Sequence, residues 1–313
     1  MSKVIVIGAG HGGLAVGARL AVKGHEVHVY EASGSAVTIP QVLTLPAAYR
    51  DLFIKTGGQL EEVLELSEPN FAFEFQTKSS GTIQIPASGV GRVLTEIEKV
   101  LGKDAANQWR NFTAVFGQIW QKSRSKLIET ESEVPLWKIV GFKNFLRIRN
   151  FEKFIKQDLN NPDLQNLARA YKAQCYVDLD SKIGLLGIGS YVHQTFGVYE
   201  PAGGLSALTK ALENRCRELG VDITFNEKAA PVVSGDQLIG VELSNGQLIA
   251  ADFVVVNDLT SLPEIAKWTD TTTPGTNSPG LYRIEERSWL GLGPSHAVMS
   301  AEIVADLIGS AAP

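Results

Sequence analysis

Cysteine, methionine and histidine are scarce in this sequence of 313 residues, which contains two, two and five of them. Cys175 and Cys216 lie far apart and form no C-x-x-C pair, which argues against a disulfide-based fold and fits a reducing compartment. The histidines share no metal-binding spacing; they are His11, His25, His28, His193 and His296. We therefore expect no metal site, and a chain of this length can bury a core without one.

The sequence also lacks long apolar runs and an excess of basic residues. No run approaches the ~20 apolar residues needed to span a bilayer, and the N-terminus enters a β pattern without a basic flank or cleavage site. The formal net charge of −5 argues against a nucleic-acid partner. We expect a cytoplasmic protein that does not span a membrane, which leaves contact with a membrane surface open. The sequence does not indicate an oligomeric state.

A cluster of glycines follows the first predicted strand. Residues 3–7 form a continuous apolar run typical of a buried strand, and a helical pattern covers residues 14–21. Between them stands a G-x-G-x-x-G motif formed by Gly8, Gly10 and Gly13, with Ala9 and Gly12 inside it. In such a motif the first glycine permits the tight turn, the second lets the backbone approach a pyrophosphate, and the third lets the helix pack on the strand. The free N–H groups at the helix start favour phosphate.

An acidic residue stands where this motif needs one. Residues 26–30 read as a second strand, and Glu31 ends it at the expected distance of ~20 residues from the glycines, followed by Ala32. A carboxylate there accepts hydrogen bonds from ribose hydroxyls and disfavours the 2′-phosphate of NADP. The alternative is a glycine-rich turn of an α/β protein that binds nothing.

The pattern of a dinucleotide domain returns near residue 200. A helix opens after Gly203-Gly204, and two turns, Ser234-Gly235-Asp236 and Asn245-Gly246, indicate a small meander. The remaining expected elements are strands at 221–225 and 253–256, a Thr/Pro/Gly loop at 271–280 and a closing helix at about 296–308. We predict an α/β fold in which a Rossmann-type FAD/NAD(P)-binding domain, residues 1–40 plus 200–313, carries a mainly helical region at 41–199.

The sequence resembles the bacterial phytoene desaturase family, within the larger group of amine-oxidase-like flavoproteins. Single matching pieces are unspecific, but five pieces in the family's order are specific. They are residues 3–33, 45–53, 195–229, 251–258 and 273–309. The third piece contains Pro-x-Gly-Gly before a helix, and the fourth reads ADFVVVND.

This resemblance implies a flavoprotein oxidoreductase that holds FAD without a covalent bond. It implies a lipophilic substrate, a long polyene or isoprenoid of carotenoid biosynthesis, that is desaturated, saturated or isomerised. Carried over by position, the glycines hold the pyrophosphate and Glu31 holds the adenosine ribose. The other implied cofactor-binding positions are Ala229 at the adenine, Glu286 near the ribityl or phosphate groups, and Ala297 and Val298 beside the flavin.

Three departures from the family pattern leave alternatives open. No Gly-Gly pair follows Glu31, only a short stretch separates Asp258 from Pro274, and Glu285 stands in place of a glycine. A shortened dinucleotide-binding relative without catalysis and a small NAD-dependent dehydrogenase are the alternatives. We assign no catalytic acid or base, because in flavin chemistry the cofactor's ring accepts the hydride and the protein supplies orientation.

Residues 134–159 combine basic and aromatic side chains in a pattern that predicts an amphipathic helix. The residues are Lys138, Lys143, Arg147, Arg149, Lys153 and Lys156, interspersed with Trp137, Phe142, Phe145, Phe151 and Phe154. This helix either lies in the interface of an anionic membrane or packs on the protein's own core.

Two further features receive structural interpretations. We expect His11, which lies inside the glycine loop, to be exposed to solvent. The alternative is that its ring N–H contacts a phosphate of the bound dinucleotide. Asp178 and Asp180 form a D-x-D pair that is more typical of a helix cap or turn than of a metal site.

Overall fold

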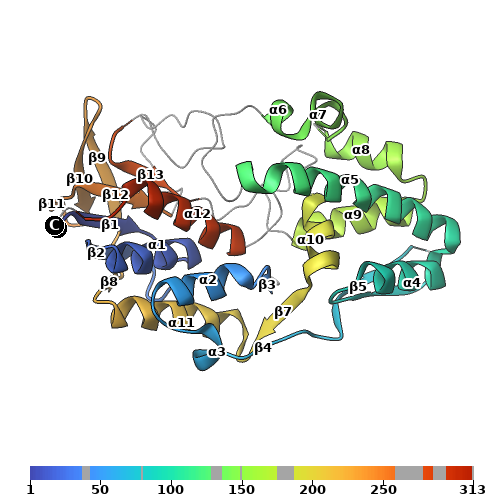
Figure 1. Ribbon diagram of the computed structural model, residues 1–313, viewed down its shortest axis with the longest axis horizontal. Coiled ribbons are helices and arrows are strands. Elements are labelled where there is room, and N and C mark those ends of the chain that lie inside the picture. The colour runs from blue at the N-terminus through green and yellow to red at the C-terminus, as the bar shows by residue number, and fades with distance from the viewer. Residues whose placement is uncertain are drawn as a thin grey trace.

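The computed structural model of the chain describes residues 1–36, 43–78, 80–127, 136–148, 150–174, 187–257, 278–284 and 294–311. Its elements form two lobes along the long axis of the molecule (Figure 1). In chain order, the sheet lobe contains the elements from Lys3 to Ser67 and from Val198 to Ile308. The helical lobe contains the elements from Phe71 to Phe196. The chain therefore leaves the sheet lobe once, builds the helical lobe, and returns.

A parallel sheet of five strands forms the centre of the sheet lobe, in the order β13-β12-β1-β2-β8. All neighbouring strands are parallel. The strands are β1 (Lys3–Ile7), β2 (Glu26–Glu31), β8 (Asp222–Phe225), β12 (Phe253–Val256) and β13 (Leu281–Arg283). Strands from the beginning and the end of the chain thus pair in one sheet, as the predicted Rossmann-type domain requires.

The two faces of this sheet are covered by different kinds of element. Val4 and Val6 pack among helices, whereas Ile5 and Ile7 pack against an antiparallel meander. The helices are α1 (His11–Val22), α11 (Gly204–Glu218) and α12 (Pro294–Ile308), and the meander is β9 (Ala229–Ser234), β10 (Gln237–Leu243) and β11 (Leu248–Ala250). Because side chains alternate along a strand, the buried apolar run of β1 contributes side chains to the cores on both faces of the sheet.

The sheet lobe extends further along the chain than the predicted boundary near residue 40. Tyr49, Leu52 and Phe53 are buried in the core between the helices of the sheet lobe. They belong to α2 (Ala47–Lys55), which is followed by α3 (Leu60–Val63). A small sheet of β3 (Leu43–Thr44), β7 (Val198–Pro201) and β4 (Leu66–Ser67) forms the side of the sheet lobe that faces the helical lobe (Figure 1). The helical region accordingly begins after β4.

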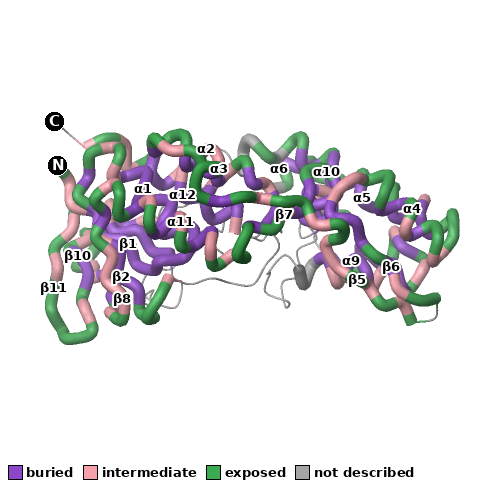
Figure 2. The backbone as a smooth tube through the Cα atoms, turned by 90° about the horizontal axis from the view of Figure 1, so that it is seen from below, coloured by how far each residue is buried: buried purple, intermediate pink, exposed green. Residues whose placement is uncertain are grey.

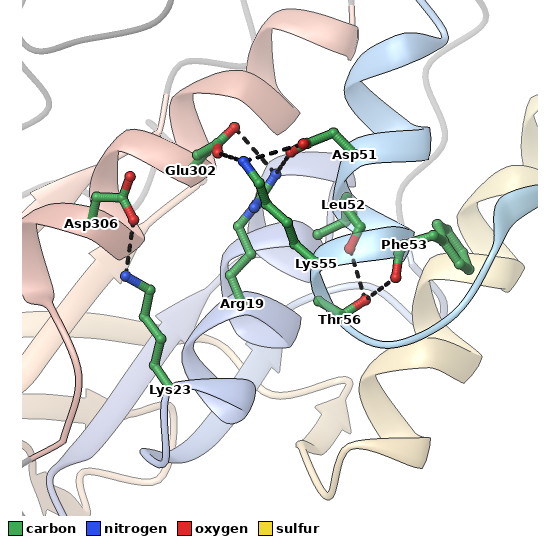
Figure 3. Close-up of polar contacts among 9 residues, drawn as sticks. All are labelled: Arg19, Lys23, Asp51, Leu52, Phe53, Lys55, Thr56, Glu302 and Asp306. Atoms are coloured by element: carbon green, nitrogen blue, oxygen red, sulfur yellow. Dashed lines mark hydrogen bonds and ion pairs between the residues drawn. The ribbon is translucent and has the colours of Figure 1, made fainter.

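Ion pairs fasten α2 to α1 and α12. Arg19 of α1 lies 2.9 Å from Asp51 of α2 and 3.3 Å from Glu302 of α12. Lys55 pairs with the same two carboxylates, and Lys23 pairs with Asp306 (Figure 3). Arg19 is buried while both of its partners are partly exposed. These contacts fix three helices that are far apart in the sequence.

The helical lobe surrounds an aromatic core. The largest fully buried side chains of this lobe are Trp109, Phe112, Phe116, Phe151 and Phe154. Figure 2 colours the backbone by burial and shows buried segments in both lobes. The elements are the hairpin β5 (Phe71–Gln76) and β6 (Thr82–Pro86), then α4 (Val90–Leu101), α5 (Lys103–Leu127), α6 (Leu136–Val140), α7 (Phe142–Ile148), α8 (Phe151–Asp158), α9 (Pro162–Gln174) and α10 (Ile188–Phe196). Among the described helices, none is both long and apolar enough to cross a membrane.

Residues 134–159 do not form the single helix that the sequence predicts. Gly141, with a φ of 86°, separates α6 from α7, and Asn150 caps α8 by accepting a hydrogen bond from the Lys153 N–H. Phe151 and Phe154 of α8 are buried in the core of the helical lobe. The prediction was wrong because the apolar spacing alone does not reveal these two interruptions.

Candidate dinucleotide site

The glycine loop lies at the carboxyl end of β1 and leads directly into α1. Gly8 has a φ of 100°, a backbone conformation that residues with a Cβ rarely adopt, and its N–H donates to the Tyr30 carbonyl at 2.8 Å. A Cβ on Gly13 would lie only 2.0 Å from the Gly8 carbonyl oxygen. The first turn of α1 therefore packs on the loop at a distance that only glycine allows.

The N-terminus of α1 is buried and has no side-chain cap among the described residues. Gly10 is its N-cap, and the first turn carries no acidic residue. The N–H groups of a first helical turn have no partner within the helix, and the helix dipole places a partial positive charge there. This arrangement suits a phosphate group.

Glu31 joins the end of β2 to the glycine loop. One oxygen of its buried carboxylate accepts a hydrogen bond from the Ala9 N–H at 2.7 Å, and the other accepts from the Ser33 N–H and the Ser33 hydroxyl, each at 2.8 Å. A carboxylate offers about four lone-pair sites, so these three bonds leave one for a ribose hydroxyl. Ala32, the next predicted site residue, is exposed beside it.

A second group of elements meets the glycine loop from the other side. A Cβ on Gly12 would lie 2.5 Å from Ile284, 2.6 Å from Asn257 Oδ1 and 3.2 Å from Ala297. Asn257 follows β12, Ile284 follows β13, and Ala297 lies in the first turn of α12. The predicted position Ala297 is thus brought to the loop, and Val298 beside it is buried in the same core.

The segment around Ala229 approaches the same edge of the sheet. Ala229 begins β9 and is buried against the meander face of the sheet. Two residues earlier, the Glu227 N–H donates to the Glu31 carbonyl at 3.1 Å. Ala229 and Glu31 are therefore close, as an adenosine site would need. Glu286 lies outside the described residues, and so do Cys175, Asp178 and Asp180.

His11 is buried, which corrects the expectation that it is exposed. Its Nδ1 lies 2.6 Å from the Tyr49 hydroxyl, and its Nε2 lies 2.7 Å from Thr209 Oγ1. Both ring nitrogens are therefore occupied by hydroxyl groups of α2 and α11. Burial lowers the pKa of His11 to about 4, so the ring is neutral at pH 7.

The residues that sequence reasoning missed are Asn257, Tyr49 and Thr209. Asn257 had a usable signal, since it follows a buried parallel strand at the edge where ligands of such sheets bind. No local sequence signal links Tyr49 or Thr209 to the glycine loop, because they lie 38 and 198 residues from the histidine that they contact.

The described part of the chain offers neither a metal site nor a reactive cysteine. No group of three or more His, Cys, Asp or Glu side chains there could hold a metal ion. Cys216 is buried, its thiol lies 3.0 Å from the Leu14 carbonyl oxygen, and burial raises its pKa to about 12. A thiol in this state is not a nucleophile.

The fold defines an α/β protein with a Rossmann-type parallel sheet, and its glycine loop has the form typical of dinucleotide-binding sites. In sequence, the chain is similar to 4,4'-diapophytoene desaturases (4,4'-diaponeurosporene-forming) of Staphylococcus aureus. The protein of strain COL is 23% identical over 255 residues, covering 74% of this chain and 49% of the relative. The protein of strain Newman is 24% identical with the same coverage. The chain spans about half the length of these curated relatives. No model of a known protein family matches it.

Solved structures with the same arrangement include two oxidoreductases. An oxidoreductase from Methanosarcina mazei has a TM-score of 0.54 and 17% identity, over 82% of this chain and 58% of that chain. A triple mutant of putrescine oxidase with redesigned cofactor binding has a TM-score of 0.58 and 13% identity, over 84% and 60%. The predicted Rossmann-type fold is confirmed, and so is the predicted resemblance to phytoene desaturase-like flavoproteins.

Proposed function

We propose that the chain is an FAD-dependent oxidoreductase that binds the cofactor without a covalent bond. The observation that carries this proposal is the convergence of the uncapped N-terminus of α1 and the Glu31 carboxylate at one edge of the parallel sheet. The residues present fit the group: the helix end suits the pyrophosphate, and Glu31 and the Ala229 segment suit the adenosine. Bound flavin would supply the acceptor for a hydride, and the protein would orient the substrate.

The same geometry distinguishes FAD from other dinucleotides. The buried carboxylate of Glu31 would repel the 2′-phosphate of NADP. The first turn of α12 lies against Gly12, so a second helix N-terminus faces the same edge of the sheet. An NAD site needs only the first of these helices, whereas the flavin half of FAD would use the second. The similarity to oxidoreductases with this arrangement supports the choice.

Calorimetry with FAD, NAD and NADP tests the cofactor. We expect FAD to bind more tightly than NADP, and a preference for NADP or NAD would contradict the proposal. Glu31→Gln should weaken FAD binding by about 1–3 kcal/mol, because in either orientation the amide NH2 faces a backbone N–H donor. Glu26→Gln is the matched control, since Glu26 lies exposed at the other end of β2.

For the substrate we propose a carotenoid-like or other isoprenoid polyene. The support is the similarity to 4,4'-diapophytoene desaturases over 74% of this chain. The FAD-loaded protein is mixed without oxygen with vesicles that contain a polyene precursor still carrying the saturated bonds to be oxidised. Transfer of a hydride to the flavin should then lower the visible absorption of the oxidised flavin. Binding of FAD without any such bleaching would favour the second candidate, a dinucleotide-binding relative without catalysis, which is motivated by the absence of a Gly-Gly pair shortly after Glu31.

We also propose that the protein touches an anionic membrane through α6 and α7. Trp137, Phe142 and Leu146 are among the exposed large apolar side chains, and Lys138 and Lys143 are exposed beside them. Arg147, by contrast, pairs with Asp158. We call this the α6–α7 surface. Each basic residue near an anionic surface contributes ~1 kcal/mol, screened over a Debye length of ~8 Å.

Co-sedimentation with vesicles that contain phosphatidylserine tests the α6–α7 surface. The protein should sediment at low salt, and the double change Lys138→Glu and Lys143→Glu should release it. The matched control is Lys153→Glu with Lys156→Glu, because these exposed residues lie on α8, whose apolar side is buried. Equal loss in both double variants, or no sedimentation at all, would contradict the assignment.

A further inference from the structure

We propose that His11 is a positioning residue for the phosphate-binding end of α1, held as a neutral ring with its proton on Nε2 by Tyr49 and Thr209. This inference rests on the proposed function, because it concerns the loop that would hold the pyrophosphate. His11 does not touch the phosphates through its side chain. It acts through the backbone of the helix end that it anchors.

The contacts place His11 between two elements that are distant in the sequence. Tyr49 lies in α2 and Thr209 in α11, and their hydroxyls are 2.6 Å from Nδ1 and 2.7 Å from Nε2. The rings of His11 and Tyr49 also meet edge to face, with centroids 5.7 Å apart. Both hydrogen bonds are buried, so water does not compete with them.

The direction of each hydrogen bond follows from the single proton of the threonine hydroxyl. We assign that proton to the Leu205 carbonyl oxygen, 3.0 Å from Thr209 Oγ1, so that Thr209 accepts from His11. Nε2 of His11 therefore carries a proton. In a neutral imidazole the other nitrogen is an acceptor, so Nδ1 accepts from the Tyr49 hydroxyl.

His11 is the first residue of α1, so fixing its ring fixes the start of the helix. On the opposite side of the loop, the Glu31 carboxylate holds the Ala9 N–H. The loop is thus attached to β2 on one side and to α2 and α11 on the other. A donor array that is already in place loses less entropy when an anion binds, and so it binds more tightly.

Affinity measurements with FAD and with ADP test the anchoring. Tyr49→Phe and Thr209→Val each remove one hydroxyl with little change of shape, and each should raise the Kd for both ligands about three- to tenfold. In the double variant the Kd should rise by less than the product of the two single fold-changes, because both hydroxyls act through one ring. Thr113→Val is the matched control, since Thr113 makes the same hydroxyl bond to the carbonyl four residues earlier in α5 without a histidine.

The ring nitrogens report the assigned hydrogen-bond directions. In protein with 15N-labelled histidine, the His11 signals are those missing from His11→Phe. At pH 7 we expect a protonated Nε2 and an unprotonated Nδ1, with Tyr49→Phe shifting mainly the Nδ1 signal. The opposite tautomer or a charged ring would overturn the proposal. If Tyr49→Phe does not fold, Thr209→Val and the wild-type spectrum still decide.

The outcomes separate this inference from the proposed function. A wild-type protein that binds neither FAD nor ADP would overturn the proposed function. A wild-type protein that binds both, together with Tyr49→Phe and Thr209→Val variants of unchanged affinity, would overturn only the role of His11.

Discussion

The sheet lobe and the helical lobe fill their cores with different side chains. Around the central strands the fully buried residues are mostly aliphatic, such as Ile5, Leu14 and Leu20, whereas the helical lobe uses Trp109 and Phe112 together with other large rings. A pleated sheet accepts β-branched and aliphatic side chains at regular spacing. The helices of the helical lobe pack on one another and on the hairpin β5–β6, and large rings fill much of the space between them. The helical lobe therefore depends on side-chain volume and the sheet lobe on backbone geometry.

The lobes also differ in where they bury polar groups. In the sheet lobe, His11, Glu31 and Asn257 gather at the carboxyl edge of the sheet around the glycine loop. In the helical lobe, His193 Nε2 lies 3.0 Å from the Pro86 carbonyl oxygen, and the Thr113 hydroxyl donates to the Trp109 carbonyl. Three buried polar groups of the sheet lobe thus gather at the candidate site, whereas these two groups of the helical lobe bond to backbone carbonyls.

The strongest test of the dependence on backbone geometry is Gly13→Ala. The new Cβ would lie 2.0 Å from the Gly8 carbonyl oxygen, so the helix and the loop would have to separate. We expect a loss of about 5 kcal/mol in the free energy of unfolding, together with loss of FAD binding. The control is Gly17→Ala on the same helix, where the nearest side-chain atoms are 3.6 Å away and the effect should be small or stabilising. Urea unfolding measures both, and equal stability of the two variants would refute the packing argument.

The dependence on side-chain volume is tested by Phe112→Ala. Phe112 is fully buried among Trp109, Phe116 and Phe154, so its truncation leaves a cavity and should cost about 3–5 kcal/mol. Phe142→Ala, at a residue that is 63% exposed, should change stability by less than about 0.5 kcal/mol. We expect Phe112→Ala to leave the FAD affinity of the folded protein unchanged, because Phe112 lies in the core of the helical lobe; a fall in affinity as large as the fall in stability would contradict this comparison of the lobes.

Acid should weaken both lobes through their buried histidines. Burial lowers the pKa of His11 and of His193 to about 4, against 6.5 in the unfolded chain. Between these values the unfolded chain binds more protons, so stability falls as the pH falls from about 6.5 to 4, by up to about 3 kcal/mol for each ring. Urea unfolding at pH 7.5 and 4.5 measures the loss. His193→Gln should remove about half of this histidine-dependent loss of stability. The control His28→Gln changes a half-buried ring and should remove less. An unchanged pH dependence in His193→Gln would contradict the assignment.

The ion pairs that join α1, α2 and α12 should contribute least. Arg19→Met removes a buried cation and leaves Asp51 and Glu302 without it, which should cost about 1–3 kcal/mol. Lys55→Met removes a half-exposed partner of the same carboxylates and should cost less than about 1 kcal/mol. Thermal unfolding at low and high salt compares them, and a larger effect of Lys55→Met would reverse the expected order.

Much of the sheet lobe could be predicted because its signals are local. The strands at 3–7 and 253–256 have the predicted bounds, since a continuous apolar run between turn residues defines a buried strand. The position of Glu31 followed from its distance to the glycines. These features depend on neighbours in the sequence and on the requirements of one motif.

The failures concern contacts between distant parts of the chain. The burial of His11 depends on Tyr49 and Thr209, which no local pattern connects to the glycine loop. The assignment of α2 to the sheet lobe depends on the core that receives Tyr49 and Phe53, because an amphipathic helix does not reveal its partner. Residues 134–159 were read as one helix because helical spacing continues across Gly141 and Asn150.

The order of strands in the central sheet has a consequence for synthesis on the ribosome. The elements of the helical lobe are contiguous from Phe71 to Phe196, whereas β1 must pair with β12, whose partner residues are 249 positions later in the chain. The helical lobe is therefore complete before β8, β12 and β13 exist. Until then, β1 and β2 have one open edge each and the glycine loop has no α12 beside it. Chains released early would expose apolar strand edges, and the competence to bind a dinucleotide would arise last.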